Sequence, residues 1–255
     1  MSFEIPESTC ELTALGTLRL LGMVRTLPRA PRLFHAASSE IFGQPVQSPP
    51  NEQTPMSPIN PHGCAKAFAA QMVTLYRNTY GLFAGNGIMY NHESPRRGEN
   101  FMTRKICRAA AAIKLGLGTE LLLGDTAAQR DWGHSRDYVR SMWFTLQHAT
   151  PDDYVFATGQ LHSVQDVVGA AFAVVELDWK RRVKQDARFL RPAEPLHRLF
   201  FWHESRMRMR FRHGALTCSR VQASPLHRPA APGSKSDSPS ILTRRGRLQG
   251  SHTDR

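Results

Sequence analysis

The sequence has 255 residues, of which 41% are hydrophobic and 21% charged, as expected for a globular protein with a core. Its formal net charge is +12, but residues 195–255 hold 12 Lys and Arg against 3 Asp and Glu, whereas residues 1–194 hold 21 against 18. This distribution excludes a basic nucleic-acid groove spread over residues 1–194, and no uncharged apolar run approaches the roughly 20 residues of a membrane helix.

The first predicted element is a helix that ends near Thr26. Ser8 and Glu11 have the spacing of a capping box, and an apolar stripe follows at Leu12, Leu15, Leu18, Leu21 and Val24. Residues 32–37 indicate a buried strand that runs into Ser38, Ser39 and Glu40. The five prolines of residues 49–61 predict a long loop, and Pro61 suits the first turn of a helix that extends to about Tyr80.

The second half of the pattern alternates in the same way. Residues 82–90 predict a buried strand, residues 101–115 and 137–146 predict helices, and residues 154–158 predict another strand. Ser163 is the expected cap of a last helix through Val175. This alternation indicates an α/β fold with crossover units on a parallel sheet. The sequence holds no Gly-x-Gly-x-x-Gly turn, so we expect a partial doubly wound, Rossmann-like sheet that lacks its first strands.

A compositional boundary near Glu194 divides the chain. We expect a folded domain over residues 1–195 and a disordered tail over 196–255, because residues 212–255 contain no aromatic side chain and are rich in Arg, Ser, Pro and Gly. Residues 206–213 alternate arginine with methionine or phenylalanine. They fit a β-like basic strip, an RNA or membrane-surface patch, or sequence never selected to fold.

The cysteines Cys10, Cys64, Cys107 and Cys218 lack CxxC spacing, so we expect buried free thiols in a reducing cytosol and neither a metal site nor a disulfide framework. The first residues have neither the basic start nor the apolar run of a secretory signal. The prediction is therefore a cytoplasmic protein without a membrane partner.

Four motifs point to one family. They are Ala37-Ser38-Ser39-Glu40, Asn60-Pro61-His62-Gly63-Cys64-Ala65-Lys66, Asn91-His92-Glu93-Ser94-Pro95-Arg96-Arg97-Gly98 and Arg130-Asp131-Trp132-Gly133-His134. Together they resemble the GDP-mannose 4,6-dehydratases of the extended short-chain dehydrogenase/reductase superfamily. The resemblance extends over residues 2–194 and includes Arg191-Pro192-Ala193-Glu194, which is similar to a family motif near the substrate.

The resemblance implies a lyase that uses NADP to convert GDP-mannose to GDP-4-keto-6-deoxymannose, a step in GDP-fucose biosynthesis. A hydride leaves C4, a base removes the C5 proton, water leaves from C6, and the hydride returns to C6. In this family a Tyr-x-x-x-Lys pair and a Ser or Thr hydroxyl serve the oxidation. The matching catalytic positions are Ser38, Glu40 as the C5 base, His62 in place of the tyrosine, and Lys66 at the cofactor ribose.

The remaining matched positions divide between cofactor and substrate. Ser8 (where the family has an aromatic side chain), Lys66, His92 and Arg97 match positions near NADP, whereas Asn91, Lys105, Arg130, Arg191 and Glu194 match positions that line the GDP-sugar. The resemblance also implies a homo-oligomer that uses residues 94–99.

Two features of this sequence leave the activity open: the glycine-rich phosphate turn of the family is missing, and His62 stands at the tyrosine position. The reach of His62 is about 2 Å shorter than that of a tyrosine, and a misplacement of about 1 Å can cost about 10²-fold in rate. We therefore expect the chain alone to be weak or inactive, and a catalytically impaired member of the family is the alternative. An interaction protein that binds nucleic acid through its basic tail is a lesser alternative. A flexible basic tail binds phosphate charge only weakly, and the nearly neutral residues 1–194 do not suggest a nucleic-acid partner.

Overall fold

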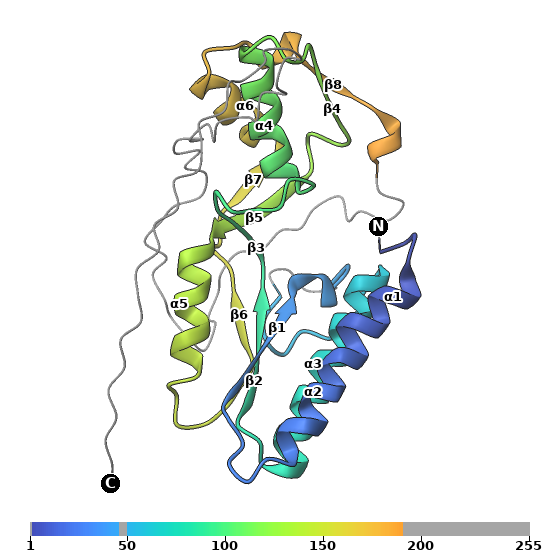
Figure 1. The fold of residues 1–255 in the computed structure, drawn as a ribbon, viewed down its shortest axis with the longest axis vertical. Helices are drawn as coiled ribbons and strands as arrows, with labels where there is room; N and C mark the ends of the chain where they lie inside the picture. Colours follow the sequence, from blue (N-terminus) through green and yellow to red (C-terminus); the bar gives the residue numbers. More distant parts are fainter. Residues whose placement is uncertain (1, 46–49, 191–255) are drawn as a thin grey trace, which may run out of the picture. The chain divides into compact units, whose positions relative to one another are not determined.

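The computed structural model describes residues 2–45 and 50–190, and Figure 1 shows their ribbon. Three parallel strands form its central sheet in the order β1 (Leu33–Ser38), β2 (Ala84–Met89) and β6 (Tyr154–Phe156). The register pairs Leu33 with Ala84 and Gly87 with Tyr154. The predicted α/β fold with a parallel sheet is therefore confirmed, although β2 and β6 are shorter than the pattern indicated and β1 is shifted by one residue.

Helices cover both faces of this sheet, as a doubly wound fold requires. Helix α3 (Pro61–Tyr80) packs Ala67 and Ala70 into one cluster with strand residues such as Ile88. Helix α5 (Ser135–Thr145) lies on the opposite face, where Tyr138 packs with Phe156. Between them, a Cβ at Gly87 would overlap the Phe34 ring, so a larger residue there would require that ring to move.

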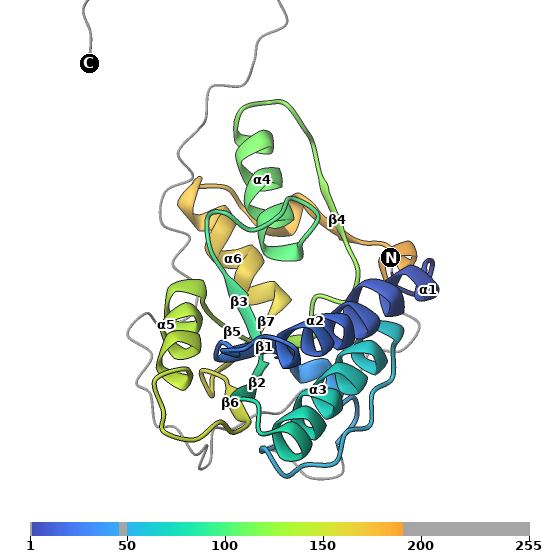
Figure 2. The same cartoon turned by 60° about the horizontal axis from the view of Figure 1, so that its bottom comes forward.

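The N-terminal helical run differs from the prediction. It comprises α1 (Pro6–Cys10), the π-helical turn η1 (Glu11–Leu15) and α2 (Gly16–Arg25), and it lies beside α3 in both ribbon views (Figures 1 and 2). The capping box was wrong: Ser8 lies inside α1, because the fixed φ of Pro6 favours an earlier start. The predicted end at Thr26 is confirmed.

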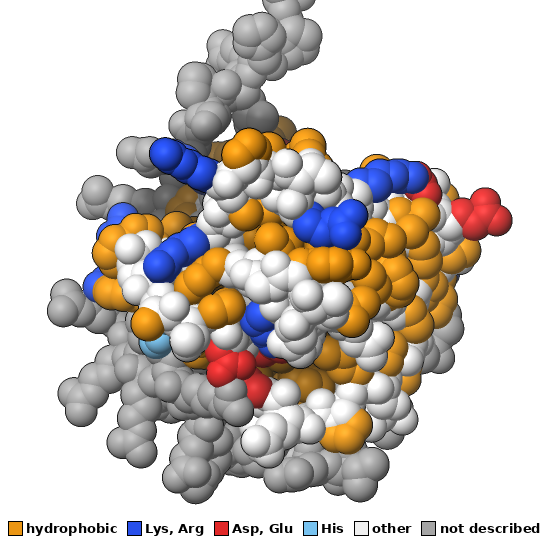
Figure 3. Space-filling view, turned by 90° about the horizontal axis from the view of Figure 1, so that it is seen from below, with side chains coloured by type: hydrophobic (Ala, Val, Ile, Leu, Met, Phe, Trp, Pro, Cys, Tyr) orange, Lys and Arg blue, Asp and Glu red, His pale blue; other side chains and the backbone are white. Residues whose placement is uncertain are grey.

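Only part of the predicted apolar stripe is buried. Leu21 and Val24 pack with Val73 of α3, whereas Leu12 is 78% exposed. A π-helical turn holds more residues than an α-helical turn, so the residues before η1 no longer share a face with those after it. Figure 3 shows hydrophobic side chains on the side where α2 and α3 lie; the exposed ones on these two helices are Leu20, Met23, Phe68, Leu75 and Tyr80.

The loop and helix of residues 50–80 follow the prediction. Residues 50–60 contain no helix or strand, and the Asn60 side chain then caps α3 by accepting the Gly63 N–H at 2.8 Å. Helix α3 ends at Gly81, whose φ of 67° lies in the left-handed region that favours glycine. Proline at the start and glycine at the end therefore fix both ends of this helix.

The rest of the described chain adds two small sheets. One has the order β3 (Asn91–Glu93), β5 (Gln129–His134) and β7 (Leu161–Ser163), with β5 and β7 antiparallel; the other pairs β4 (Leu121–Leu123) with β8 (Val183–Gln185). Helices α4 (Met102–Lys114) and α6 (Val164–Val174) lie where the pattern predicted helices, and they pack against each other. The short 3₁₀ turns are η2 (Ser39–Ile41), η3 (Trp179–Arg181) and η4 (Ala187–Phe189).

The cap of α6 is confirmed in detail. The Asp166 N–H donates to Ser163 Oγ at 3.0 Å, and the Ser163 N–H donates to Asp166 Oδ2 at 2.8 Å. This is the reciprocal pair of a capping box. His134 similarly caps α5 by accepting the Arg136 N–H at 3.1 Å, in line with a structural histidine.

The predicted burial of the cysteines is wrong for two of them, and several predictions for the C-terminal part of the chain concern residues that the structure does not describe. Cys10 and Cys64 are exposed rather than buried, because both lie on outward faces of their helices, and Cys107 is half-buried. The boundary after residue 195, the tail over 196–255, the strip over 206–213 and Cys218 lie outside the described residues. Among the described helices, none has the length and apolar character needed to cross a membrane.

Candidate active site

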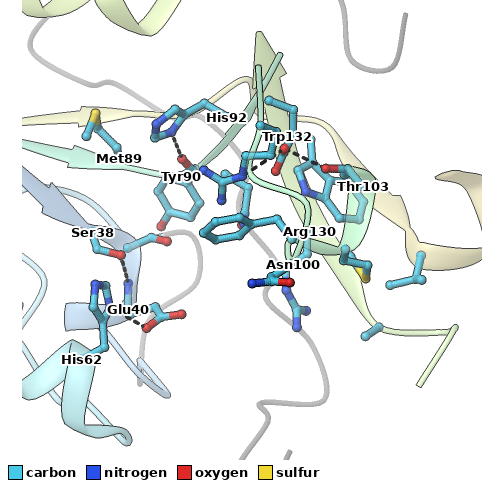
Figure 4. A pocket seen from close by; sticks show the side chains of 18 of the residues that line it. Ser38, Glu40, His62, Met89, Tyr90, His92, Asn100, Thr103, Arg130 and Trp132 are labelled. Atoms are coloured by element: carbon cyan, nitrogen blue, oxygen red, sulfur yellow. Dashed lines mark hydrogen bonds and ion pairs between the residues drawn. The ribbon is translucent and has the colours of Figure 1, made fainter. Parts of the chain in front are cut away.

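A cavity of about 560 Å³ lies at the carboxyl ends of β1 and β2, where parallel α/β sheets bind their ligands. Residues far apart in the sequence meet there. Nine of the predicted site residues line it: Ser38, Glu40, His62, Lys66, Asn91, His92, Arg97, Lys105 and Arg130. Ser8 does not, since it is exposed on α1, and Arg191 and Glu194 lie outside the described residues. Figure 4 shows two walls that face each other across this cavity.

The first wall joins the end of β1 to the start of α3. Ser38 ends β1, and its Oγ accepts the Glu40 N–H at 3.3 Å. Glu40 Oε2 lies 3.0 Å from His62 Nδ1, so the carboxylate orients the imidazole (Figure 4). A Cβ at residue 63 would stand 2.7 Å from the Glu40 carbonyl oxygen, so the close approach of these two segments depends on Gly63.

This pairing gives the first wall a defined acid–base chemistry. When Glu40 accepts from Nδ1, His62 can exchange a proton through Nε2, and the carboxylate stabilises the imidazolium that forms. The two side chains are 38% and 22% exposed, so both remain within reach of a ligand. Both residues were predicted as catalytic from the sequence, but their interaction with each other was not predicted.

Lys66 completes the first wall one helical turn after His62. Its Nζ donates to the Ala36 carbonyl at 2.7 Å, and burial lowers the pKa of Lys66 from its ordinary value. An ammonium group has three N–H donors, so this contact leaves donors for a ligand. The side chain is thus an oriented cation at the floor of the cavity.

The second wall depends on side-chain contacts within residues 90–103. Glu93 Oε2 accepts the Thr103 hydroxyl at 2.7 Å and lies 3.2 Å from Arg97 Nε. The Arg97 guanidinium stands 3.5 Å above the Phe101 ring. Burial raises the pKa of Glu93, against the opposing effects of Thr103 and Arg97. Sequence reasoning missed Glu93, Phe101 and Thr103, although the four-residue spacing of Glu93 and Arg97 was a usable signal.

Four further predicted residues stand on this side: His92, Lys105, Arg130 and Asn91. His92 Nδ1 lies 2.9 Å from the Tyr90 carbonyl oxygen, and its ring stacks on Tyr138 with centroids 4.7 Å apart. Lys105 Nζ donates to the Leu122 carbonyl at 2.9 Å and lies 4.1 Å from the centre of the Phe189 ring.

Arg130 is only 9% exposed and donates to the Gln129 carbonyl at 2.7 Å. Asn91 begins β3, in register with Trp132 of β5. Lys105, Arg130 and Arg97 are cations around one cavity, which suits an anionic ligand such as a diphosphate.

Comparisons with known proteins match most of this chain to one family. A family model described as GDP-mannose 4,6 dehydratase matches residues 1–208. The chain is 48% identical over 198 residues to "GDP-mannose 4,6 dehydratase 1" of Arabidopsis thaliana, covering 76% of this chain and 55% of that protein. It is 47% identical over 174 residues to the human "GDP-mannose 4,6 dehydratase", covering 68% and 47%. The chain thus spans about half the length of the curated relatives it matches.

Solved structures support the fold. RMD from Pseudomonas aeruginosa, complexed with NADPH, matches with a TM-score of 0.67 at 23% identity, over 72% of this chain and 63% of that one. DesIV, a dTDP-glucose 4,6-dehydratase from Streptomyces venezuelae with NAD and TYD bound, matches with a TM-score of 0.67 at 22% identity, over 76% and 58%. At these identities the likeness establishes a shared α/β fold.

Proposed function

The chain belongs to the GDP-mannose 4,6-dehydratase family, and from this membership we propose that it serves the conversion of GDP-mannose to GDP-4-keto-6-deoxymannose with NADP. The observation that carries the proposal is the single cavity in which nine predicted site residues meet. The net reaction is loss of one water, made up of the O4 proton and the C6 hydroxyl: the hydride taken from C4 is returned to C6, and the proton removed from C5 is replaced there once the C6 hydroxyl has left.

The first wall supplies the acid–base groups. His62, oriented by Glu40, takes the proton of the sugar O4 hydroxyl through Nε2, and the Ser38 hydroxyl binds O4. Glu40 is the base for the C5 proton. Since its Oε2 is held by His62, removal of the C5 proton and protonation of His62 are coupled in this chain.

The residues present fit the ribose end of a nicotinamide cofactor, because the Lys66 ammonium is oriented by Ala36 and lies beside Ser38 at the carboxyl end of β1. Lys66 would hold the ribose hydroxyls, and His92 and Arg97 would contact the phosphates. When bound, the cofactor supplies the hydride acceptor and donor. The protein's part is to orient the sugar and to hold the protons at O4 and C5.

The second wall suits the GDP part of the substrate. Lys105 and Arg130 supply charge-assisted donors for the diphosphate, and Asn91 supplies an amide for the sugar. Arg191 and Glu194 belong to the same proposed substrate set. We further propose a cytoplasmic homo-oligomer that uses residues 94–99, where the exposed Glu99 pairs with Arg108.

A second candidate function is binding of GDP-mannose without turnover. The Glu40–His62 pair favours it, because the family's tyrosine position holds a shorter side chain that is already engaged with the C5 base. We predict little or no turnover by this chain alone. The variant His62→Tyr restores the family's residue and separates a side-chain defect from the lack of a glycine-rich phosphate turn in the sequence.

The deciding experiment measures GDP-mannose binding by calorimetry and formation of the keto-sugar with NADP, on the full chain. Binding that weakens at least tenfold in Arg130→Met supports the substrate assignment. The exposed Arg140→Met is the matched control and should bind as the parent chain does. Absence of GDP-mannose binding would overturn the proposed function, and turnover at the rate of an ordinary family member would overturn the impaired alternative.

A further inference from the structure

A buried histidine stands behind the first wall and takes no part in the proposed reaction. His35 lies in β1, next to Ala36, whose carbonyl receives Lys66. It is 7% exposed, and its Nδ1 lies 2.8 Å from Asn86 Oδ1. Among the described residues, no hydrogen-bond partner reaches His35 Nε2.

The neighbours of Asn86 fix the protonation of this imidazole. Asn86 Nδ2 donates to the Ala70 carbonyl at 3.1 Å and to Asp153 Oδ1 at 2.9 Å, so its carbonyl oxygen must face His35. His35 therefore carries its hydrogen on Nδ1, and Nε2 is a bare acceptor. A proton added to Nε2 would make a buried cation whose new N–H has no acceptor within the described chain.

The same contacts join the elements that carry the first wall. Asn86 ties β2 to Ala70, which lies one turn after Lys66 on α3, while His35 ties β1 to Asn86. Asp153, just before β6, accepts the Asn86 N–H at 3.1 Å and the Arg77 guanidinium at 2.8 Å. This cluster, in which His35 and Asn86 are buried and Arg77 and Asp153 are partly exposed, holds α3 against β1.

We propose that His35 is a positioning residue: as a neutral imidazole it holds the wall of Ser38, Glu40, His62 and Lys66 together, and its protonation in mild acid loosens that wall. The inference concerns the fold of the wall and does not depend on the identity of the substrate. It also does not follow from the family resemblance, which assigns no role to this position.

The charged groups around His35 agree with this proposal. The pKa of His35 is lowered to about 4, chiefly by burial; the hydrogen bond with Asn86 opposes this shift, the positive charge of Lys66 adds to it, and Asp153 opposes it. Arg77 and Asn86 hold the pKa of Asp153 below its ordinary value despite burial, so Asp153 stays ionised through the same range. Protonated His35 would therefore place a second cation near Lys66, at the point where Lys66 bonds to Ala36.

The sign of the effect follows from the two states of the histidine. An unfolded histidine gains its proton near pH 6.5, whereas folded His35 gains it near 4, so stability is lost as the pH falls between these values. With these two values the folding constant drops about 20-fold between pH 7 and pH 5 from this residue alone.

The test compares the full chain with His35→Gln, whose side-chain amide can still donate to Asn86 but cannot be protonated, and with His148→Gln at an exposed histidine. Urea unfolding is measured at pH 7 and pH 5, together with hydrogen exchange of residues 33–40 and 61–70 corrected for intrinsic rates. Between pH 7 and pH 5 we expect the folding constant of the parent chain and of His148→Gln to fall about 20-fold more than that of His35→Gln, and the exchange of these residues to become faster in the first two proteins than in His35→Gln.

The parent chain provides a direct test that does not depend on the folding of His35→Gln. NMR titration of the histidine rings in the parent chain should show His35 as the Nδ1–H tautomer with a midpoint near pH 4. A His35 midpoint near 6.5, or an equal acid loss in His35→Gln and the parent chain, overturns the proposal.

Discussion

The two walls of the cavity face the same ligand but are supported by different kinds of contact. The first wall stands on β1 and α3, which are held from behind by the cluster around Asn86 and Asp153. The second wall stands on β3, the loop after it and the first turn of α4, and Glu93 at the end of β3 meets Thr103 of α4 through their own side chains. A substitution behind the first wall should therefore change the stability of the whole sheet, whereas one in the second wall should act on the ligand.

The largest expected effect comes from Asp153→Ala. Asp153 pairs with Arg77 at 2.8 Å, and the side chains are only 22% and 14% exposed, so the change leaves a mostly buried cation without its partner. We expect a loss of about 3 kcal/mol in the free energy of unfolding at pH 7. Because the pKa of Asp153 is below its ordinary value, this contribution is lost as the pH falls through that lowered pKa. Urea unfolding of the parent chain and of Asp153→Ala at several pH values measures the loss at pH 7 and its decrease in acid.

The matched control is Glu99→Ala, which removes the exposed pair of Glu99 with Arg108. Exposed pairs contribute about 0–1 kcal/mol, so this variant should unfold nearly as the parent chain does. Equal losses in the two variants would mean that burial behind the first wall does not set its stability.

The next largest effect is expected from Gly63→Ala. The added Cβ would stand 2.7 Å from the Glu40 carbonyl oxygen, a backbone atom that cannot turn aside. We expect a loss of about 1–3 kcal/mol in the free energy of unfolding, together with weaker GDP-mannose binding as Glu40 and His62 separate. Gly22→Ala is the control: no atom lies within 4 Å of its added Cβ, so that change should be neutral or slightly stabilising.

The sequence predicts the first wall better than the second for a physical reason. Pro61, the Asn60 cap and Gly81 are local signals, so the bounds of α3 follow from the residues at its ends. The same is true of Ser163 and Asp166 at the start of α6. These signals act within four residues and need no knowledge of the rest of the chain.

Contacts between residues far apart in the sequence have no such local signal. The strands β3, β4, β7 and β8 have three residues each, too few to show a period of two. His35 and Asn86 are 51 residues apart, and the Glu40–His62 pair spans 22. Resemblance to a family predicted which residues meet in the cavity, but not that Glu40 bonds to His62 or that Glu93 holds Arg97.

The smallest effect on stability is expected in the second wall, from Glu93→Gln. The amide oxygen can still accept the Thr103 hydroxyl, so the change in the free energy of unfolding should stay below about 1 kcal/mol. Burial raises the pKa of Glu93, which means that ionisation of this carboxyl costs stability in the folded chain. Relative to the parent chain, Glu93→Gln should therefore gain stability as the pH rises from about 4.5 to 7.

Binding should respond more strongly than stability to the same change. Without the carboxylate, Arg97 loses its ion pair with Glu93 and keeps its contact with the Phe101 ring. We expect NADP and GDP-mannose, measured separately by calorimetry, to differ in their loss of affinity. A loss confined to NADP supports the proposed place of Arg97 at the cofactor phosphates. A loss of affinity confined to GDP-mannose would assign Arg97 to substrate binding instead. A loss of stability as large as that of Asp153→Ala would contradict the proposed difference in how the two walls are supported.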